Sequence, residues 1–336
     1  MRAQLLEESV PRDADEIVSH LLAVQAQDLH SARLALRARS SGLTTQDVDS
    51  ALTVDRSLVV AWLGRGTLHL VHRDDYPWLL SLTAPARGAP NRRRLRQEGV
   101  SANQAERAVS VIGAALAEEG LLTRPELAAR MAAHKIPTAG QATPHLLMLA
   151  TLRGVSVLGP IKDGVQAFVL TETWLGTRSN STTCDDRPAM LQQLARRYLR
   201  GHAPAGPEDL AGWSGLGLRE ARSVIEPVDL GDAGDSEPSN SSVRLLPSYD
   251  PYLLGWKDRS FIVPDAHKRD VHPGGGVLRG TVIADGEAIG TWSHRRDGDR
   301  IKIDVNAFAP LSAEAEEQVQ REALDVARFE GLTLSR

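Results

Sequence analysis

The stretch "LTTQDVDSALTVDRSLVVAWLGRGTLHLVH", residues 43–72, is the part of the chain that most directly predicts its fold. Its opening, "LTTQDVDSAL", has threonines suited to capping a helix, an acid in the first turn and then apolar residues, which is typical of the start of a short helix. We expect a third, apolar helix at residues 56–64, followed by a β-prone segment at 67–72. With the amphipathic pattern of residues 14–25 in front, the order is helix, short helix, helix, β-hairpin. That order predicts a winged helix, a helix-turn-helix variant that binds DNA.

The same order recurs twice further along the chain. In each copy a longer helical pattern precedes a short helix with a capped or Pro-led start, and an apolar helix and a β-prone stretch follow. The second copy comprises residues 102–120, 122–131, 143–154 and 155–171, and the third comprises 187–202, 206–215, 218–227 and 228–230. Three tandem winged helices are the interpretation we prefer, and separate helical bundles are the alternative.

A small β-rich domain is predicted after the third copy. Residues 229–242, "DLGDAGDSEPSNSS", are rich in Gly, Asp, Ser and Pro and are typical of a linker. Beyond them, alternating apolar and polar residues surround a hairpin signal at Asp285 and Gly286. A closing helix is expected at residues 312–331, with Ser312 at its start and acids in its first turn.

The predicted fold class is therefore α+β, with three winged helices before the β-rich domain. The domain limits that follow are a first winged helix at residues 1–85, a second at 86–178, a third at 179–240, and the C-terminal domain at 241–336.

Composition narrows the class of protein and the compartment. The chain has 336 residues, of which 42% are hydrophobic and 24% charged, as expected of a multidomain globular protein. One cysteine, Cys184, allows no intrachain disulfide and no thiolate metal cluster, which fits a reducing cytoplasm. No apolar leader or membrane span is visible, so we expect a cytoplasmic protein that joins the nucleoid when bound to DNA.

Arginine clusters suggest a surface that faces phosphate. The net charge of −4 argues against indiscriminate coating of nucleic acid. Three clusters with little acid inside them, at residues 87–97, 196–200 and 294–300, are nevertheless suited to DNA. Solvated helix faces and loops are the alternative for any one of them.

Catalytic motifs of the common kinds are absent from the sequence. There is no phosphate-binding Gly-x-x-x-x-Gly-Lys loop, no His-Glu-x-x-His and no paired Cys-x-x-Cys, so we expect no cofactor and no metal. His69 and His72 are three apart in a presumed strand, so they face opposite sides and form no ligand pair. Asp250, with Arg259 as a potential ion-pair partner, is interpreted as a structural corner, while DNA contact by its flanking tyrosines is the alternative.

Four segments in this order resemble the AlkZ and YcaQ family of bacterial winged-helix DNA glycosylases. They are "AVQAQDLHSARLALRAR" (23–39), "AWLGRGTLHLVHRDDYPWLL" (61–80), "LLPSYDPYLLGWKDR" (245–259) and "DGEAIGTW" (285–292). The resemblance spans almost the whole chain. It implies three winged helices and a β-rich domain bent into a C-shaped clamp around duplex DNA, with the family's catalytic motif on Gln25, Ala26 and Gln27. The final Gln resembles the AlkZ version of the motif, found in self-resistance enzymes that remove bulky guanine adducts of antibiotics.

Two amides suit the chemistry that the resemblance implies. A guanine alkylated at N7 carries a positive charge and leaves without protonation, so the enzyme needs only to position water and stabilise an oxocarbenium-like sugar. Amide carbonyls can orient that water but are no real base at pH 7. We therefore expect a monofunctional glycosylase that acts on cationic lesions, including bulky monoadducts and interstrand crosslinks, and not on uracil. An open concave face is expected to reach the lesion in the stack.

The helical stripe of residues 14–25 raises a geometric question about this motif. On one helix Gln25 and Gln27 would point about 200° apart. We therefore expect the helix to end within residues 24–28, so that both amides reach one face. Gln25 should be the partly buried anchor and Gln27 its more exposed partner, while Asp28 caps the next helix.

The predicted DNA contacts come from the wing, the basic clusters and a hairpin at residues 281–292 proposed as a groove probe. They are Arg65, His69, Arg92, Arg93, Arg94, Arg295 and Arg296. The partner is duplex DNA containing alkylated guanine, and the expected state is a monomer. A winged-helix transcription regulator without catalysis is the main alternative, although it gives no reason for two amides at positions 25 and 27. A small-molecule hydrolase using Asp250 is a third, but the sequence offers it no nucleophile and base.

Overall fold

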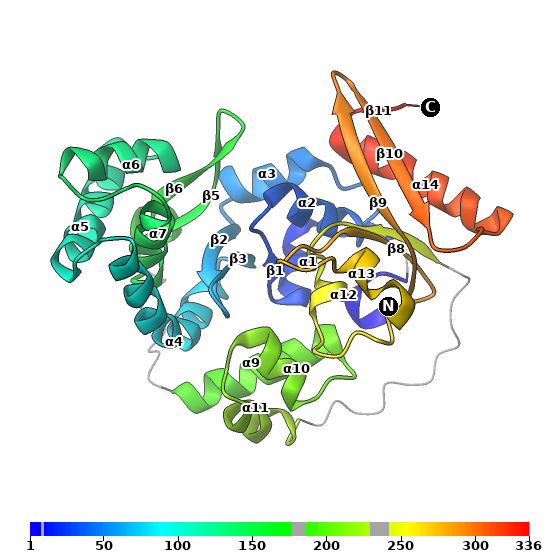
Figure 1. Ribbon diagram of the computed structural model, residues 1–336, viewed down its shortest axis with the longest axis horizontal. Helices are drawn as coiled ribbons and strands as arrows, with labels where there is room; N and C mark the ends of the chain where they lie inside the picture. Colours follow the sequence, from blue (N-terminus) through cyan, green and yellow to red (C-terminus); the bar gives the residue numbers. More distant parts are fainter. Residues whose placement is uncertain (8–9, 177–185, 229–241, 336) are drawn as a thin grey trace. The chain divides into compact units, whose positions relative to one another are not determined.

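The computed structural model describes residues 1–7, 10–176, 186–228 and 242–335 and divides the chain into two compact units (Figure 1). The first unit comprises Met1–Val48, Leu194–Trp213 and Gly217–Arg336, and the second comprises Asp49–Gln193 and Ser214–Leu216. The predicted linker lies outside the described residues except for Ser242, as does Cys184. No helix of the described residues is long and apolar enough to cross a membrane.

The first helix ends earlier than its apolar pattern suggests. Helix α1 (Ala14–Leu21) begins after Asp13, whose carboxylate accepts the Glu16 N–H at 2.7 Å. It ends at Leu21 because Leu22 takes a positive φ of 70°, which a right-handed helix does not allow. The helix predicted over residues 14–25 was therefore four residues too long. The motif follows in strand β1 (Val24–Gln25) and the loop before helix α2 (Leu29–Arg37).

The stretch at residues 43–72 forms one helix and a hairpin. Helix α3 (Thr45–Thr53) is confirmed, but the helix predicted at residues 56–64 is wrong, because strand β2 (Leu58–Leu63) occupies that segment. Every residue of β2 is buried, and a short, continuous apolar run cannot be assigned to helix or strand from periodicity. Strand β2 pairs antiparallel with β3 (Thr67–His72). The order along the chain is thus α1, α2, α3, β2, β3, so α2 is a helix that the predicted order did not contain.

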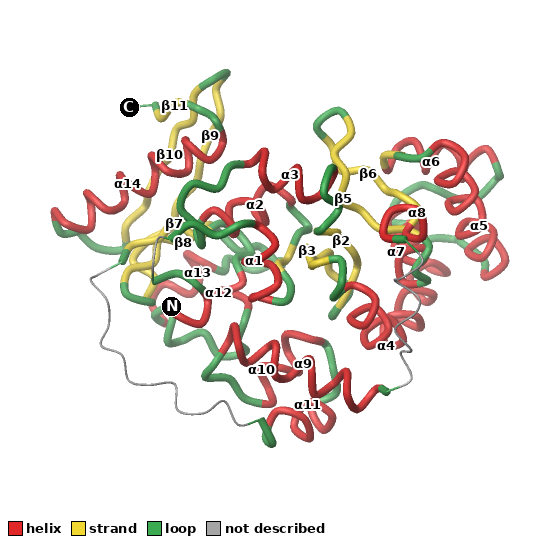
Figure 2. Tube along the Cα trace, turned by 180° about the vertical axis from the view of Figure 1, so that it is seen from behind, coloured by secondary structure: helices red, strands yellow, loops and turns green. Residues whose placement is uncertain are grey.

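The second copy of the pattern is confirmed, except that its short helix begins at Arg124 because Leu122 and Thr123 form strand β4. Capping boxes at Ser101–Gln104 and Thr123–Glu126 start two of its helices. Its strands join those of the first hairpin in the order β3-β2-β5-β6-β4. Figure 2 shows α5, α6 and α7 gathered beside β5 and β6. The elements of this part are α4 (Tyr76–Gln97), α5 (Ala102–Glu119), β4 (Leu122–Thr123), α6 (Arg124–Ala133), α7 (Ala142–Leu152), β5 (Ser156–Lys162), β6 (Val165–Leu170) and α8 (Thr171–Leu175).

The third copy keeps its three helices. They are α9 (Arg187–His202), α10 (Pro207–Ser214) and α11 (Leu218–Ile225). Of its expected β-prone residues, Val228 is not in a strand, and 229 and 230 lie outside the described residues. The mixed α+β class is confirmed, whereas the number of winged helices and the four domain limits stay predictions. The limit between residues 85 and 86 falls inside the continuous helix α4.

The C-terminal part forms a five-stranded sheet with the order β11-β10-β9-β8-β7. The hairpin at Asp285 and Gly286 and the closing helix capped by Ser312 are both confirmed. A core around Trp256, Ile262 and Leu253 lies under this sheet. Its elements are β7 (Val243–Leu246), α12 (Pro251–Leu254), α13 (Lys268–Val271), β8 (Gly280–Ala284), β9 (Glu287–Asp297), β10 (Arg300–Ala307), α14 (Ala313–Glu330) and β11 (Thr333–Leu334), with short 3-10 turns at Arg2–Gln4 and Asp265–His267.

Asp250 forms a buried corner, as the preferred interpretation held. Its two carboxylate oxygens accept from the Arg39 guanidinium at 2.8 Å each, and Oδ1 also accepts the Tyr252 N–H at 2.8 Å. Both side chains of the ion pair have 0% exposure. The prediction of Arg259 as partner was wrong, because that guanidinium donates to the Trp256 carbonyl. Asp250 thus stabilises the fold and has no surface to offer a ligand.

Candidate active site

The two amides of the motif lie together in the loop before α2. Gln25 is partly buried, Gln27 is exposed, and Ala26 between them is fully buried and anchors the loop. The Gln25 Nε2 donates to the Gln27 Oε1 at 3.2 Å. The prediction that both amides reach one face is confirmed, and so are their unequal exposures. The break that allows this is the left-handed Leu22 and the short strand β1, which together end helical geometry before Gln25.

Asp28 caps α2, as predicted. Its carboxylate accepts the His30 N–H at 3.2 Å, the Ser31 N–H at 3.3 Å and the Ser31 hydroxyl at 2.6 Å. These bonds satisfy helix-terminal donors and place negative charge where the helix dipole favours it. Because Asp28 directly follows Gln27, the cap also holds the end of the motif loop at a defined position.

A cluster of titratable side chains adjoins the start of α2. The His30 Nε2 lies 3.1 Å from the Glu330 Oε1 on α14, and the rings of His30 and His294 are centred 4.8 Å apart. The Glu330 carboxylate raises the pKa of His30. Burial, with the positive charge of His30, lowers the pKa of His294. The cluster links the helix after the motif to β9 and to the closing helix.

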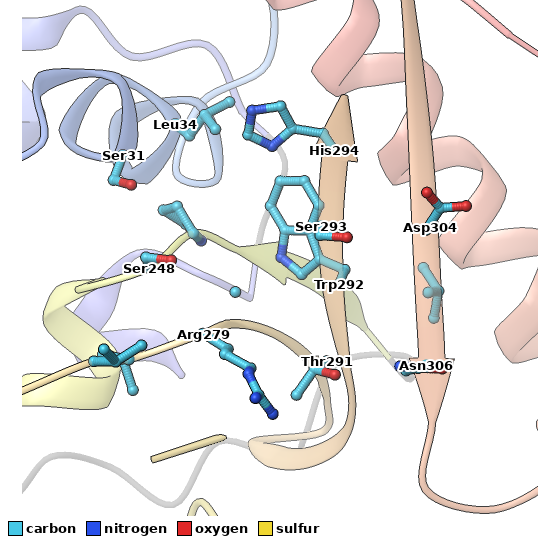
Figure 3. Close-up of a pocket in the computed structure, with 15 residues that line it drawn as sticks. Ser31, Leu34, Ser248, Arg279, Thr291, Trp292, Ser293, His294, Asp304 and Asn306 are labelled. Carbon is cyan, nitrogen blue, oxygen red and sulfur yellow. The ribbon is translucent and has the colours of Figure 1, made fainter. Parts of the chain in front are cut away.

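A cavity of about 600 Å³ opens next to the capped end of α2. Figure 3 shows Ser31 and Leu34 of α2 on one side, Trp292 and His294 of β9 on another, and Arg279 below them. Its volume falls within the range of small-molecule sites. The full lining is Ser31, Leu34, Pro247, Ser248, Val277, Leu278, Arg279, Gly280, Thr291, Trp292, Ser293, His294, Asp304, Val305 and Asn306.

Arg295 and Arg296 lie at the base of the predicted β8–β9 hairpin, on the part of β9 that pairs with β10. The turn at Gly286 is tied down, since its carbonyl accepts the Tyr252 hydroxyl at 2.9 Å. Strands β9 and β10 continue beyond β7 and β8 of their sheet (Figure 1), with β11 paired to β10 at Arg300 and Ile301, and Arg295 and Arg296 are exposed on that extension. The register sets Arg295 directly opposite Lys302. The Asp304 carboxylate neutralises Lys302 at 2.6 Å, which leaves Arg295 as the exposed cation of this pair. The groove probe predicted at residues 281–292 stays a prediction.

The two DNA contacts predicted on the β2–β3 hairpin of the second unit differ in exposure and charge. Arg65 is exposed in the turn between β2 and β3, where Gly64 and Gly66 have positive φ. His69 lies on β3, with its Nδ1 3.0 Å from the Thr67 carbonyl oxygen. Burial lowers the pKa of His69 to about 4, so the ring is neutral at pH 7. Arg65 therefore carries positive charge at the tip of the wing and His69 does not.

The three arginines of α4 are exposed on the helix surface. Arg93 points away from the buried line of Asn91 and Leu95, and Arg92 and Arg94 flank that line. Arg94 forms an ion pair with Glu98 at 2.7 Å, which neutralises part of its charge. Of this cluster, Arg92 and Arg93 are the better candidates for phosphate contact.

Sequence reasoning missed the cluster of His30, His294 and Glu330 and the cavity beside it. These side chains come from positions that no motif spacing connects, and only the packing of α14 and β9 against α2 brings them together. The described residues also contain no group of three or more His, Cys, Asp or Glu side chains that could hold a metal ion.

Comparisons with known proteins agree on one family. The family model described as "DNA glycosylase AlkZ-like" matches residues 18–329. An "Interstrand DNA cross-link repair glycosylase" of Streptomyces sahachiroi is 26% identical over 363 residues, which cover 99% of this chain and 95% of the relative. The solved structure of the Streptomyces sahachiroi DNA glycosylase AlkZ matches with a TM-score of 0.79 and 23% identity, covering 100% of this chain and 96% of that one.

Proposed function

Because the chain belongs to the AlkZ-like DNA glycosylase family, we propose that it hydrolyses the N-glycosidic bond of cationic N7-alkylguanine in duplex DNA. The substrates are bulky monoadducts or interstrand crosslinks, such as those of DNA-alkylating antibiotics, and the role is base excision repair or self-resistance. The observation that carries this proposal is the amide pair of Gln25 and Gln27, joined at 3.2 Å in a partly exposed loop. The transcription-regulator alternative receives no support from the comparisons.

The reaction needs little from the protein beyond positioning. Water adds to C1′ of the deoxyribose, the C1′–N9 bond breaks, and its electron pair neutralises the positive charge of the alkylated ring. The water loses one proton to solvent, so the products are a neutral alkylguanine and an abasic site. Orientation of the water and stabilisation of positive charge on the sugar therefore supply the rate enhancement.

The two glutamines are the proposed catalytic residues. Gln25 uses its Nε2 on Gln27, which leaves the Gln25 Oε1 and the second lone pair of the Gln27 Oε1 as acceptors. Two acceptors on one face can hold both hydrogens of a water and direct its oxygen at C1′. Asp28 adds a negative charge next to the motif, although its oxygens already accept three hydrogen bonds from α2.

The DNA contacts are proposed on exposed cations. Arg295 and Arg296 on the β9–β10 hairpin would follow a groove, and Arg65, Arg92 and Arg93 would contact phosphates. His69 and Arg94 are weaker candidates, because the His69 ring is partly buried and neutral and Arg94 is paired with Glu98. One chain acting as a monomer suffices, since every proposed contact lies on this chain. The name of the Streptomyces relative supports the inclusion of crosslinks among the substrates.

Incubation with a duplex containing 7-methylguanine, followed by alkali, tests the proposal. Wild type should release the base and leave alkali-labile sites. The variant Gln25→Ala with Gln27→Ala should lose about 10²–10³-fold of the rate, as expected when positioned polar groups are removed. A duplex containing uracil should stay intact, because a neutral base that is not protonated must leave as an anion, and the two amides supply no acid to protonate it.

The matched control is Gln46→Ala, which removes an exposed glutamine from α3. It should cleave as fast as wild type. Equal cleavage by the double variant and wild type would remove the glutamines from the mechanism, while absence of any abasic site with wild type would refute the glycosylase activity on this lesion.

A further inference from the structure

We propose that His30 is a positioning residue of the excision reaction, acting as an imidazolium that pairs with Glu330 and fixes the turn of α2 directly behind the glutamine motif. This inference rests on the proposed function, because it concerns how Gln27 is held during that reaction. His30 follows Gln27 by three residues and lies in the first turn of α2. Any tilt of that turn therefore moves the motif loop.

The carboxylate of Glu330 depends on the charge of His30. The His30 Nε2 lies 3.1 Å from the Glu330 Oε1, and the Glu330 side chain is only 11% exposed. No hydrogen bond from the described residues reaches that buried oxygen, so the imidazolium is what compensates it. Burial of a carboxylate without such compensation is costly. The pair is therefore held by charge, and it weakens when the imidazole loses its proton.

The helix ends alone do not explain why either charge is where it is. His30 lies in the first turn of α2, and Glu330 is the last residue of α14. A helix dipole disfavours a cation in the first turn and an anion in the last. Each group therefore receives from the other the stabilisation that its own helix does not supply. The pair serves to join two segments rather than to stabilise either helix.

The turn of α14 that carries Glu330 is itself fixed. The Thr45 hydroxyl donates to the Phe329 carbonyl at 3.1 Å, directly before Glu330. The Arg328 guanidinium donates to the Leu43 carbonyl at 3.0 Å. Glu330 is thus a stationary anchor, and the start of α2 is the part that it holds.

Helix α2 is attached to α14 at both ends, by ion pairs of different kinds. At the far end the fully buried Arg37 donates to Glu322 at 2.9 Å and to Asp325 at 3.3 Å. A guanidinium stays protonated in proteins, whereas an imidazole titrates near neutral pH. Loss of the proton from His30 therefore frees the end of α2 that follows the motif and leaves the other end attached.

The charged and titratable groups that face His30 come from α2, α14 and β9. Glu330 raises the pKa of His30 most, burial lowers it, Asp28 raises it further and Arg33 lowers it, and the net direction is upward. The His294 ring on β9 is centred 4.8 Å away, and burial, with the charge of His30, lowers its pKa. His294 is therefore neutral at pH 7, and His30 is the member of the two that carries the proton.

The test measures release of 7-methylguanine from a duplex in single turnovers at saturating enzyme, between pH 5.5 and pH 8.5. The wild-type rate constant should be highest at the acid end, where His30 is protonated and paired. It should fall about fivefold as pH rises through the pKa of His30, the size expected of one partly exposed ion pair. The rate constant of the bound complex reports groups that titrate in that complex.

Three variants assign this step to the pair. His30→Gln should show the low rate constant at every pH, because a neutral amide does not replace the charge. His30→Lys keeps a cation and should keep the high rate constant up to pH 8.5. Glu330→Gln keeps the shape of the side chain but removes the charge that raises the pKa of His30, so its step should move to lower pH. The half-saturating enzyme concentration should stay within about twofold of wild type in all three, since a positioning role acts on the rate of the bound complex.

The matched control is His267→Gln. His267 also pairs with a carboxylate, that of Asp270 at 2.9 Å, but in the segment around α13. This variant should keep the wild-type rate constant and its pH profile.

The outcomes separate this proposal from the proposed function. No release by wild type at any pH refutes the function. Release with a rate constant that is independent of pH, with a step that persists in His30→Gln, or with an unmoved step in Glu330→Gln overturns the positioning role and leaves the function standing. A His30→Gln variant that changes only the half-saturating concentration overturns it as well, because His30 is then a DNA contact.

Discussion

Two aspartates of this protein occupy the same local position and serve different ends. Asp28 begins α2 and Asp250 begins α12, and each accepts backbone N–H groups of the helix it caps. Asp250 is fully buried, and both terminal nitrogens of the Arg39 guanidinium donate to it. Asp28 is exposed, and the two motif amides come directly before it in the sequence. A helix cap is common to both, and only the environment distinguishes them.

The difference shows how to separate a structural polar group from a functional one. At the Asp250 corner each carboxylate oxygen has found partners inside the protein, so no acceptor is left for a ligand. At the motif the amides satisfy each other only in part and face solvent. The motif amides therefore keep acceptors that a ligand can use, whereas the carboxylate oxygens of Asp250 have all their hydrogen bonds inside the protein.

The largest effect expected is on stability at the corner. Asp250→Ala leaves the Arg39 guanidinium buried without its counter-charge, where both side chains have 0% exposure. We expect the free energy of unfolding in urea to fall by about 3–5 kcal/mol. The double glutamine variant should change it by less than about 0.5 kcal/mol, because exposed polar groups contribute little. An equal decrease in the free energy of unfolding for the two variants would contradict the distinction between a structural corner and a functional motif.

A smaller effect is expected at the motif's own cap. Asp28→Ala should cost about 1 kcal/mol of stability, and it should also slow excision because the loop carrying Gln27 is no longer fixed. Ser312→Ala is the matched control, since Ser312 caps α14 by accepting the Ala315 N–H at 3.2 Å. It should cost a similar stability and leave excision unchanged. Asp28→Asn keeps an acceptor and should restore most of the stability, so any remaining loss of rate reports the negative charge.

The cap and the unequal glutamines could be predicted because local rules govern them. An Asp before an apolar helical pattern is a strong start signal, and a pair of residues two apart must leave a helix to share one face. The hairpin at Asp285 and Gly286 follows from equally local turn chemistry. These features need no knowledge of distant residues, and the structure confirms each of them.

Features that depend on tertiary packing could not be predicted in this way. The buried run at residues 58–63 fits a helix or a strand until its partner β3 is known. Arg39 pairs with an aspartate 211 positions away, and sequence proximity had favoured Arg259. Likewise the end of β9 pairs with β10 and not with β8, so the strand that lies opposite Arg295 and Arg296 could not be predicted from local turn signals.

The smallest effect expected is a pH dependence of stability at the cluster beside the motif. The Glu330 carboxylate, 3.1 Å from the His30 Nε2, raises the pKa of His30. A raised pKa in the folded state means stability that is fully present below the unfolded value, near 6.5, and lost as pH rises through the folded value. Unfolding in urea at pH 6 and pH 8 should therefore show that His30→Gln costs about 0.5 kcal/mol more at pH 6. Glu330→Gln should abolish the same difference, whereas an equal cost of His30→Gln at both pH values would show that the pair carries no charge-dependent stability.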